Sequence, residues 1–360
     1  MPVGRDDSSP SGVWAPLLIA LVLVLIDAYE GDRPQYVGVL TAMPLLADAL
    51  TTPLYVAFVG TTVTGMAFVL GIFQEDMGLS AAISTPQLTR LGFIVAATVL
   101  GVVVAGSRQG RTNRMRQLAS VADAAQQAIL RPLPSMVGPF HCATTYLSAT
   151  TGASIGGDLV EVLATPYGVR VIVGDVRGKG LDAVRLAGRV LGSFREVAHT
   201  VEDLATLART MDSAVRRDAG PEDFVTAMLI ELDGAGNMTI CDCGHPAPYV
   251  VAPSGGPAVE LDTSPEPPLG LLGGSVATTT CTLERTQRLV IVTDGLLEAR
   301  RPRRFWDRSS GGFFPAEEAL GAALGVGPLS TGLKQVVTAV RRWTRGRLRD
   351  DLAVLVLQRH

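Results

Sequence analysis

The feature that most constrains this chain is the near-absence of charge from its first 106 residues. Only eleven of them are Asp, Glu or Arg, and none is Lys. Uncharged runs cover residues 8–26, 34–47, 49–74 and 91–107. A helix that crosses a bilayer needs about 20 apolar residues, with about 17 as the lower limit. The second run is short and contains Pro44, but it could still span as half of a tight hairpin with the third. We therefore expect a transmembrane region at residues 1–106 with about four helices, and three as the alternative.

Charge on either side of these runs predicts their orientation. Residues 27–33 and 75–76 are net acidic, whereas four arginines follow the last run with no acid before Asp123, namely Arg108, Arg111, Arg114 and Arg116. Positive charge next to a span is retained in the cytoplasm. The pattern predicts a multi-pass protein of the cell membrane with its large C-terminal part in the cytoplasm. The alternative is that the runs are core helices of a large soluble domain.

A connecting helix is expected at residues 107–131. Met115, Leu118, Ala122, Ala125 and Ile129 recur at spacings of 3, 4, 3 and 4, which is the seam of a short coiled coil. Such a seam would join two copies into a homodimer through residues 115–129. The alternative is that the helix packs on its own domain. Pro132 and Pro134 end the helix, because proline cannot continue one.

The composition excludes some classes of protein. A formal net charge of −3 argues against a nucleic-acid-binding protein, which would carry a clustered excess of Lys and Arg. Four cysteines in 360 residues do not indicate a disulfide framework.

Residues 132–360 form the expected soluble domain, in which strands and helices occur in groups. We expect strands at residues 158–165, 169–176, 224–232, 238–243, 289–293 and 352–357, and helices at 184–198, 204–214 and 332–343. Paired hairpins and paired helices indicate an α+β fold with sheets packed face to face and helices outside, rather than a parallel βαβ arrangement.

Acidic residues stand where several of these strands begin or end. Asp175 and Asp294 each follow an apolar run, Asp158 opens the first strand, and Asp350 and Asp351 precede the last. An acid beside a buried strand is costly to ionise unless a positive charge neutralises it. Carboxylate ligands favour hard ions such as Mg²⁺ or Mn²⁺. Any single Asp-Gly is more often a turn, so the prediction of a cation site rests on the combination.

Taken in order, the motifs resemble those of the metal-dependent protein serine/threonine phosphatases (the phosphatase 2C superfamily), in the bacterial SpoIIE-like branch. The similarity covers residues 126–358 and is carried by QQAILRPLP at 126–134, GGD at 156–158, GDVRGKG at 174–180, AMLIELD at 227–233, GHPAP at 244–248, PLGLL at 268–272, TDGLLEAR at 293–300 and DDLAVLVL at 350–357.

The resemblance implies an αββα sandwich with two Mn²⁺ or Mg²⁺ ions at one edge of its sheets. Asp175 would bridge both ions and, with Asp294, be central to catalysis. The Val176 carbonyl, Asp158 and Asp350 would complete the set of ligands, with Asp351 as the alternative to Asp350. Two metal ions activate a water molecule that attacks phosphorus.

Other residues of these motifs have weaker implications. Arg177 and Lys179 would attract the substrate phosphate, or would belong to a solvated loop. Glu161 stands where the family commonly has a second aspartate, and we assign it no metal. Cys241 and Cys243 are expected to be structural, and His245 is expected to shape a turn.

The resemblance further implies a phosphoserine or phosphothreonine substrate on a regulatory protein, such as an anti-sigma-factor antagonist. Two rival functions are a catalytically weak phosphatase fold acting as a binding module, and a membrane receptor or transporter with a regulatory soluble domain. Apart from Asp48 near the end of one span, the expected spans lack the intramembrane charges of an ion path, which argues against a transporter.

Overall fold

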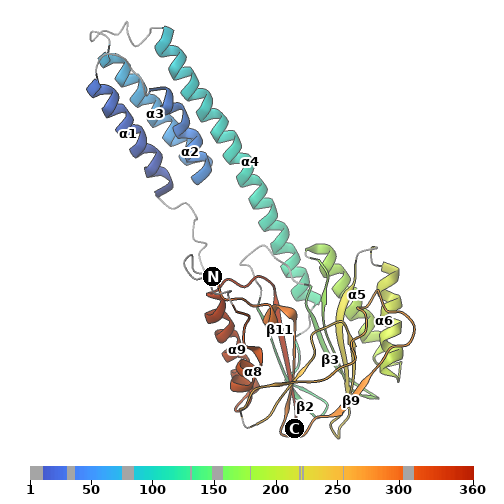
Figure 1. The fold of residues 1–360 in the computed structure, drawn as a ribbon. Coiled ribbons are helices and arrows are strands. Elements are labelled where there is room, and N and C mark those ends of the chain that lie inside the picture. The colour runs from blue at the N-terminus through green and yellow to red at the C-terminus, as the bar shows by residue number, and fades with distance from the viewer. Residues whose placement is uncertain are drawn as a thin grey trace. The chain divides into compact units, whose positions relative to one another are not determined.

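The computed structural model divides the chain into two units, Met1–Met115 and Arg116–His360. Each is described by itself (Figure 1). The residues that the structure describes are 11–30, 37–74, 85–129, 132–147, 157–178, 180–218, 220, 223–253, 255–302 and 312–360.

The N-terminal unit is helical. Its elements are α1 (Ser11–Glu30), the 3₁₀ helix η1 (Val37–Thr41), α2 (Ala42–Leu50), α3 (Pro53–Gln74) and the first part of α4 (Thr85–Ile129). Apolar side chains fill the centre of this bundle, where Ala20, Ala47, Val56, Val59 and Val63 have no exposed surface. Other apolar side chains are exposed, among them Leu18, Phe58, Phe93 and Val99. A large apolar outer surface is typical of helices that contact a bilayer or another protein.

Among the described residues, two helices are long and apolar enough to cross a membrane by length and composition. They are Pro53–Ile72, with a mean hydropathy of 1.8, and Gln87–Met115, with 2.1. Trp14–Tyr29 and Gly38–Ala49 are shorter apolar helices. The count of four spans therefore stays a prediction. Residues 31–36 and 75–84 lie outside the described ranges, and the predicted orientation is likewise untested.

The fourth apolar run and the connecting helix form one continuous helix, α4, which has 45 residues. Sequence patterns predicted two segments here because the charge changes at Arg108. The helical backbone continues across this change. Arg108 donates hydrogen bonds to the carbonyls of Asp48 and Thr51 at the end of α2, which ties α4 to the turn between α2 and α3. Of the proposed seam, Met115 is exposed. The side chains of residues 118–129 lie outside the description, and the homodimer stays a prediction.

Within the described residues, the C-terminal unit contains two antiparallel sheets. One is ordered β1-β2-β11-β10-β7-β8, with bounds Met136–Val137, Phe140–Leu147, Leu352–Arg359, Arg288–Val292, Tyr249–Val251 and Val259–Glu260. The other is ordered β3-β4-β5-β6-β9, with bounds Leu159–Thr165, Gly168–Val176, Val225–Leu232, Asn237–Cys243 and Thr279–Thr282. The helices are α5 (Leu181–Val197), α6 (Leu204–Asp218), α7 (Asp294–Leu297), α8 (Ala316–Leu324) and α9 (Leu329–Thr344).

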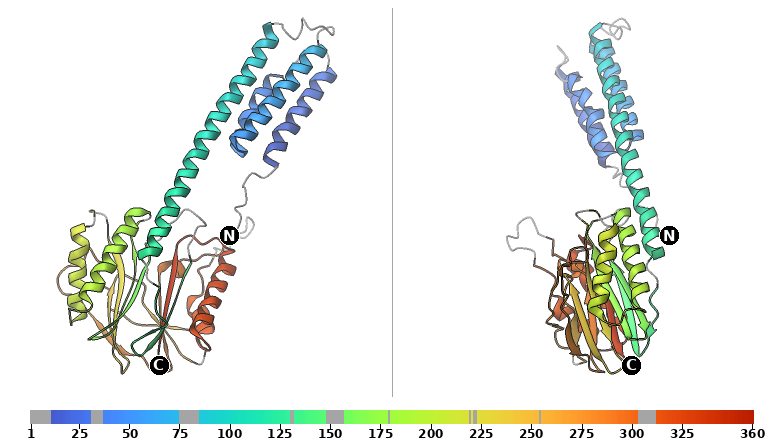
Figure 2. Two further views of the ribbon diagram at one scale, coloured as in Figure 1. Left: turned by 180° about the vertical axis from the view of Figure 1, so that it is seen from behind. Right: turned by 90° about the vertical axis from the view of Figure 1, so that its right-hand side faces the viewer.

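Alternation along the strands explains the layers. In β4, Val171 and Val173 point between the two sheets, while Ile172 points to the other face and packs with α5 and α6. Residues of β10 divide in the same way, with Ile291 between the sheets and Val290 toward α8 and α9. Figures 1 and 2 show α5 and α6 outside one sheet and α8 and α9 outside the other. The predicted αββα sandwich is therefore confirmed.

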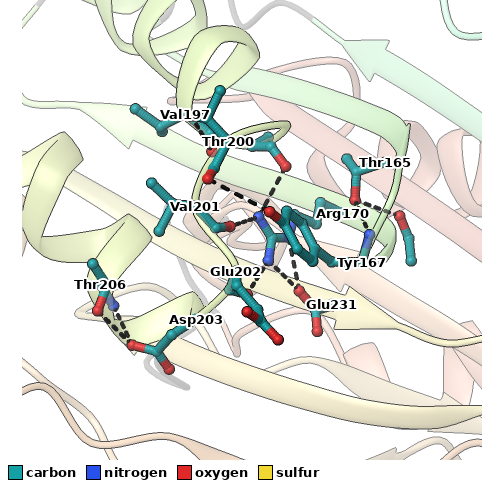
Figure 3. Close-up of polar contacts among 12 residues, drawn as sticks. Thr165, Tyr167, Arg170, Val197, Thr200, Val201, Glu202, Asp203, Thr206 and Glu231 are labelled. Atoms are coloured by element: carbon teal, nitrogen blue, oxygen red, sulfur yellow. Dashed lines mark hydrogen bonds and ion pairs between the residues drawn. The ribbon is translucent and has the colours of Figure 1, made fainter.

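A buried arginine joins β4 to the turn between α5 and α6 (Figure 3). The Arg170 side chain is fully buried, and its Nε donates to Glu231 Oε2 at 2.7 Å. Its remaining N–H groups donate to the carbonyls of three turn residues, which are Ala198, Val201 and Glu202. The guanidinium also lies 4.6 Å from the centre of the Tyr167 ring. A buried charge needs such partners, and here they fix the turn against the sheet.

Candidate metal centre

Strand register brings the predicted acids together at one end of each sheet. Asp158 immediately precedes β3, and Asp175 is the penultimate residue of β4. Because Leu159 pairs with Gly174, these two acids lie beside each other. In the other sheet, Val292 at the end of β10 pairs with Val354 near the start of β11. Asp294, which follows β10, therefore lies near Asp351, which precedes β11.

Thr293 connects the two sheets at this place. Its side chain has no exposed surface, and its hydroxyl donates to Asp158 Oδ2 at 2.9 Å. The Thr293 hydroxyl oxygen also accepts the backbone N–H of Ala353, at 2.9 Å. A threonine directly before Asp294 thus holds the Asp158 carboxyl group toward the strand ends of the opposite sheet.

Two glycines allow this close approach. A Cβ atom at Gly157 would lie 2.6 Å from Asp175 Oδ1 and would collide with the Val176 carbonyl oxygen. A Cβ atom at Gly295 would collide with the carbonyl oxygen of Asp351. Both contacts exclude any side chain, so packing requires the glycines of the Gly-Asp and Asp-Gly pairs in these motifs.

The electrostatics of Asp158 show how crowded the acids are. Its side chain is buried, and this burial raises its pKa well above the usual range. The negative charge of Asp175 raises the pKa further, the hydrogen bond from Thr293 lowers it, and the charges of Asp351 and Asp294 raise it again. Such a group ionises readily only when a cation is nearby.

The donor chemistry fits a hard divalent ion. The groups at this edge are carboxylates and the Val176 carbonyl, and oxygen-only sites favour Mg²⁺ or Mn²⁺ over zinc. In the part of the chain that the structure describes, however, no three Asp, Glu, His or Cys side chains lie close enough together to hold one ion. The acids of this edge are therefore neighbours that do not converge on one point.

The structure distinguishes the two members of the Asp350-Asp351 pair. Asp351 is buried, and its charge raises the pKa of Asp158. Asp350 is half-buried, and its Oδ1 accepts the backbone N–H of Asp351 at 3.1 Å. Because successive side chains near a strand point to opposite sides, only one of the two can face the sheet interior.

The structure describes two of the other predicted residues, Arg177 and Glu161. Arg177 is exposed, its guanidinium lies 5.2 Å from the centre of the Phe224 ring, and its backbone N–H donates to the Phe224 carbonyl at 3.0 Å. Lys179 lies outside the described residues. Glu161 points toward α5 and forms an ion pair with Arg195 at 2.5 Å.

Sequence reasoning missed the surroundings of His245. Its imidazole is buried, and Nδ1 lies 3.2 Å from the Thr226 hydroxyl. Burial lowers the pKa of His245 to about 4, although the Val292 backbone favours the protonated ring. His245 Nε2 is buried and forms no hydrogen bond within the described residues, so Val292 is near but not at hydrogen-bonding geometry. The Gly-His-Pro motif was the available signal, but it indicated only a turn.

The strand that precedes His245 contains two buried cysteines. The sulfur atoms of Cys241 and Cys243 lie 3.8 Å apart, and both side chains pack in the core beneath α5 and α6. The hydrogen bond with the Cys241 thiol, together with burial, raises the pKa of Cys243. Asp242 points the other way, where it accepts the His245 backbone N–H and the Thr263 hydroxyl.

An αββα sandwich with aspartates at adjoining strand ends defines a phosphatase domain of the PP2C type. The family model described as "Stage II sporulation protein E (SpoIIE)" matches residues 165–360. The chain belongs to this family and is homologous to the PP2C-type protein serine/threonine phosphatases, which are metal-dependent.

Solved structures agree on the fold. The SiaA-PP2C domain of Pseudomonas aeruginosa is 18% identical with a TM-score of 0.57, and the match covers 71% of this chain and 99% of that one. The RsbU and RsbW domains of a Mycobacterium tuberculosis protein are 23% identical with a TM-score of 0.53, and the match covers 62% of this chain. It spans only 61% of the length of that second protein.

Proposed function

We propose that this chain is a membrane-anchored phosphatase that removes phosphate from serine or threonine of a regulatory protein, with two Mn²⁺ or Mg²⁺ ions as cofactor. The observation that carries the proposal is the position of Asp158. Its carboxyl group is buried and accepts the Thr293 hydroxyl of the opposite sheet at 2.9 Å. Burial and the charges of Asp175, Asp351 and Asp294 raise its pKa. This concentration of buried acid is explained by a cation site.

Each ligand has a structural support. Asp175, the Val176 carbonyl and Asp158 come from one sheet, and Asp294 comes from the other, together with Asp350 or its alternative Asp351. Thr293 orients Asp158, and Gly157 leaves room for Asp175 and Val176. When bound, two divalent ions lower the pKa of a water molecule and offset charge on the phosphoryl oxygens. Asp175 and Asp294 would be the residues on which catalysis depends most.

The substrate phosphate would approach from the exposed side. Arg177 stacks on Phe224 there and presents its guanidinium charge to solvent. A planar guanidinium can bind two phosphate oxygens at once. Lys179, two residues further along, would add a second positive charge. The proposed protein substrate is phosphorylated on serine or threonine, as an anti-sigma-factor antagonist would be.

The helical unit would anchor the enzyme. We propose that residues 1–106 cross the cell membrane several times, with the catalytic domain in the cytoplasm and α4 leading to it. Two described helices long and apolar enough to cross a membrane support this proposal. A homodimer through residues 115–129 would bring two catalytic domains together.

A second candidate function is a binding module with little catalytic power. The absence of three converging ligand side chains among the described residues favours it.

Purified full-length protein in detergent would distinguish the two functions. It should be treated with EDTA, assayed on phosphoserine and phosphothreonine proteins, and assayed again after Mn²⁺ is added. The proposed enzyme is silent with EDTA and active with Mn²⁺. Binding of a phosphoprotein without turnover at saturating Mn²⁺ would establish the binding module instead.

A further inference from the structure

Thr293 uses its side chain in place of its backbone at the end of β10. Its N–H donates to the Ala353 carbonyl at 3.1 Å, as in an ordinary antiparallel pair. In such a pair the Thr293 carbonyl would accept the Ala353 N–H in return, but that N–H donates to the Thr293 hydroxyl oxygen at 2.9 Å. The Thr293 carbonyl instead accepts the Leu296 N–H at 3.2 Å, at the start of α7. The hydroxyl therefore lets the chain leave the sheet at Asp294 while the Ala353 N–H keeps a partner.

The direction of the next hydrogen bond follows from the proton count. A threonine hydroxyl has a single proton and accepts through its lone pairs. Because the oxygen accepts the Ala353 N–H, its own proton is donated to Asp158 Oδ2, which lies 2.9 Å away. An ionised carboxylate can only accept, so this direction is fixed in the form that binds a cation. Two hydrogen bonds thus run in series from the backbone of β11 through Thr293 to Asp158.

The helix that follows does not explain the threonine. Thr293 occupies the N-cap position of α7, where a threonine hydroxyl usually accepts an N–H from the first turn of its helix. Here the side chain makes no such bond. It is fully buried, as is nearly all of Asp158, and its hydrogen bond goes to the other sheet. The local role of the hydroxyl is replaced by a contact with an acid.

This contact joins acids from both sheets. Asp294 directly follows Thr293 in the chain, so the two share one backbone segment. In the other sheet, Asp158 directly follows Gly157, and a Cβ atom at Gly157 would lie 2.6 Å from Asp175 Oδ1. A shift of the Asp158 carboxyl group would therefore change its separation from both Asp294 and Asp175.

We infer that Thr293 is a positioning residue, whose hydroxyl fixes the Asp158 carboxyl group relative to Asp294 and thereby sets the affinity of the centre for its divalent ions. The inference rests on the proposed function. Thr293 needs to supply no ligand atom, because it holds one proposed ligand by a hydrogen bond and the other by a peptide bond. Residues that orient metal ligands commonly change metal affinity by about 10–100-fold.

The test measures Mn²⁺ binding directly on full-length protein, by the loss of the free Mn²⁺ signal in electron paramagnetic resonance. Thr293→Val keeps the branched shape of the side chain but removes the hydroxyl and both of its hydrogen bonds. It should weaken Mn²⁺ binding at least about tenfold. Thr293→Ser keeps the hydroxyl and should bind Mn²⁺ within about threefold of wild type.

A matched control separates a misplaced carboxyl group from a loosened sheet. Thr144 lies on β2, and its hydroxyl donates to the Val354 carbonyl of β11 at 3.1 Å. Thr144→Val therefore removes a threonine hydrogen bond to the same strand, one that does not involve Asp158. It should bind Mn²⁺ like the wild type. Circular dichroism should show that each variant is folded at the temperature of the binding measurement.

The outcomes are distinct. Wild-type Mn²⁺ affinity in a folded Thr293→Val would overturn the inference, and so would a Thr293→Ser variant as weak as Thr293→Val. An equal loss in Thr144→Val would also overturn it. If Thr293→Val does not fold, Thr293→Ala replaces it, because it removes the hydroxyl without placing a methyl group against the carboxylate, and wild-type affinity there would overturn the inference. Wild-type protein that binds no Mn²⁺ at all would instead contradict the proposed function.

Discussion

Replacing Arg170 with methionine should destabilise the catalytic unit more than any surface change. The variant leaves the carbonyls of Ala198, Val201 and Glu202 without their donor and removes the partner of Glu231. Removing one member of a buried ion pair costs about 3–5 kcal/mol. Because the Glu231 side chain is 23% exposed and can regain water, we expect the lower end, about 3 kcal/mol.

Thermal unfolding of the full-length protein is the assay. For a unit of this size, 1 kcal/mol shifts Tm by about 2–4 °C, so Arg170→Met should lower Tm by about 6–12 °C. Arg209→Met is the matched control, since Arg209 is exposed on α6 and donates to the Thr206 hydroxyl on the same helix. It should change Tm by no more than about 2 °C. If Arg170→Met behaved like the control, the buried network would not hold the turn between α5 and α6.

Three further predictions concern topology, assembly and charge. Reporter fusions after residues 30 and 78 should be periplasmic or extracellular, and a fusion after residue 112 should be cytoplasmic, because arginines follow the last span. A cytoplasmic reporter at residue 78 would contradict the four-span topology. If the wild-type protein is a dimer in analytical ultracentrifugation, Leu118→Asp should convert it to a monomer, because a charge is placed in the coiled-coil seam. A monomeric wild-type protein would refute the intermolecular seam. In EDTA, the raised pKa of Asp158 means that the folded state holds this proton to higher pH than the unfolded state. Stability from this group is therefore full below the unfolded pKa and is lost as pH rises through the folded pKa. Asp158→Asn should raise the Tm of metal-free protein at neutral pH and make Tm depend less on pH. An unchanged Tm would show that ionised Asp158 does not destabilise the metal-free fold.

Sequence patterns predicted the parts of the fold that local signals define. Strands β4 and β10 each contain an apolar run that leads to an aspartate, Asp175 or Asp294, and the positions of both strands were predicted to within a residue or two. Strand β2 was missed, because its sequence mixes polar and apolar residues and its partner β11 lies about 200 positions away. Sequence patterns are read over short segments, so they cannot reveal a strand pairing between residues so far apart.

The same limit applies to the site. Motifs predicted the acids, but a one-residue ambiguity between Asp350 and Asp351 could only be examined once the strand faces were known. His245 was predicted as a turn residue, since its contact with Thr226 and its position near Val292 depend on two sheets meeting. Arg170 was included in an apolar strand, because its partners are backbone carbonyls that no sequence pattern identifies.

The most direct test of the central claim compares phosphatase activity of three variants at saturating Mn²⁺. Asp175→Asn and Asp294→Asn keep the shape of the side chain but remove the charge that would hold the ions. Each should lose at least ~99% of wild-type activity, which corresponds to about 3 kcal/mol of transition-state stabilisation. Glu161→Gln is the control, because Glu161 pairs with Arg195 on the helix side of the sheet, and it should retain most activity. Near-normal turnover by Asp294→Asn would contradict the two-metal account.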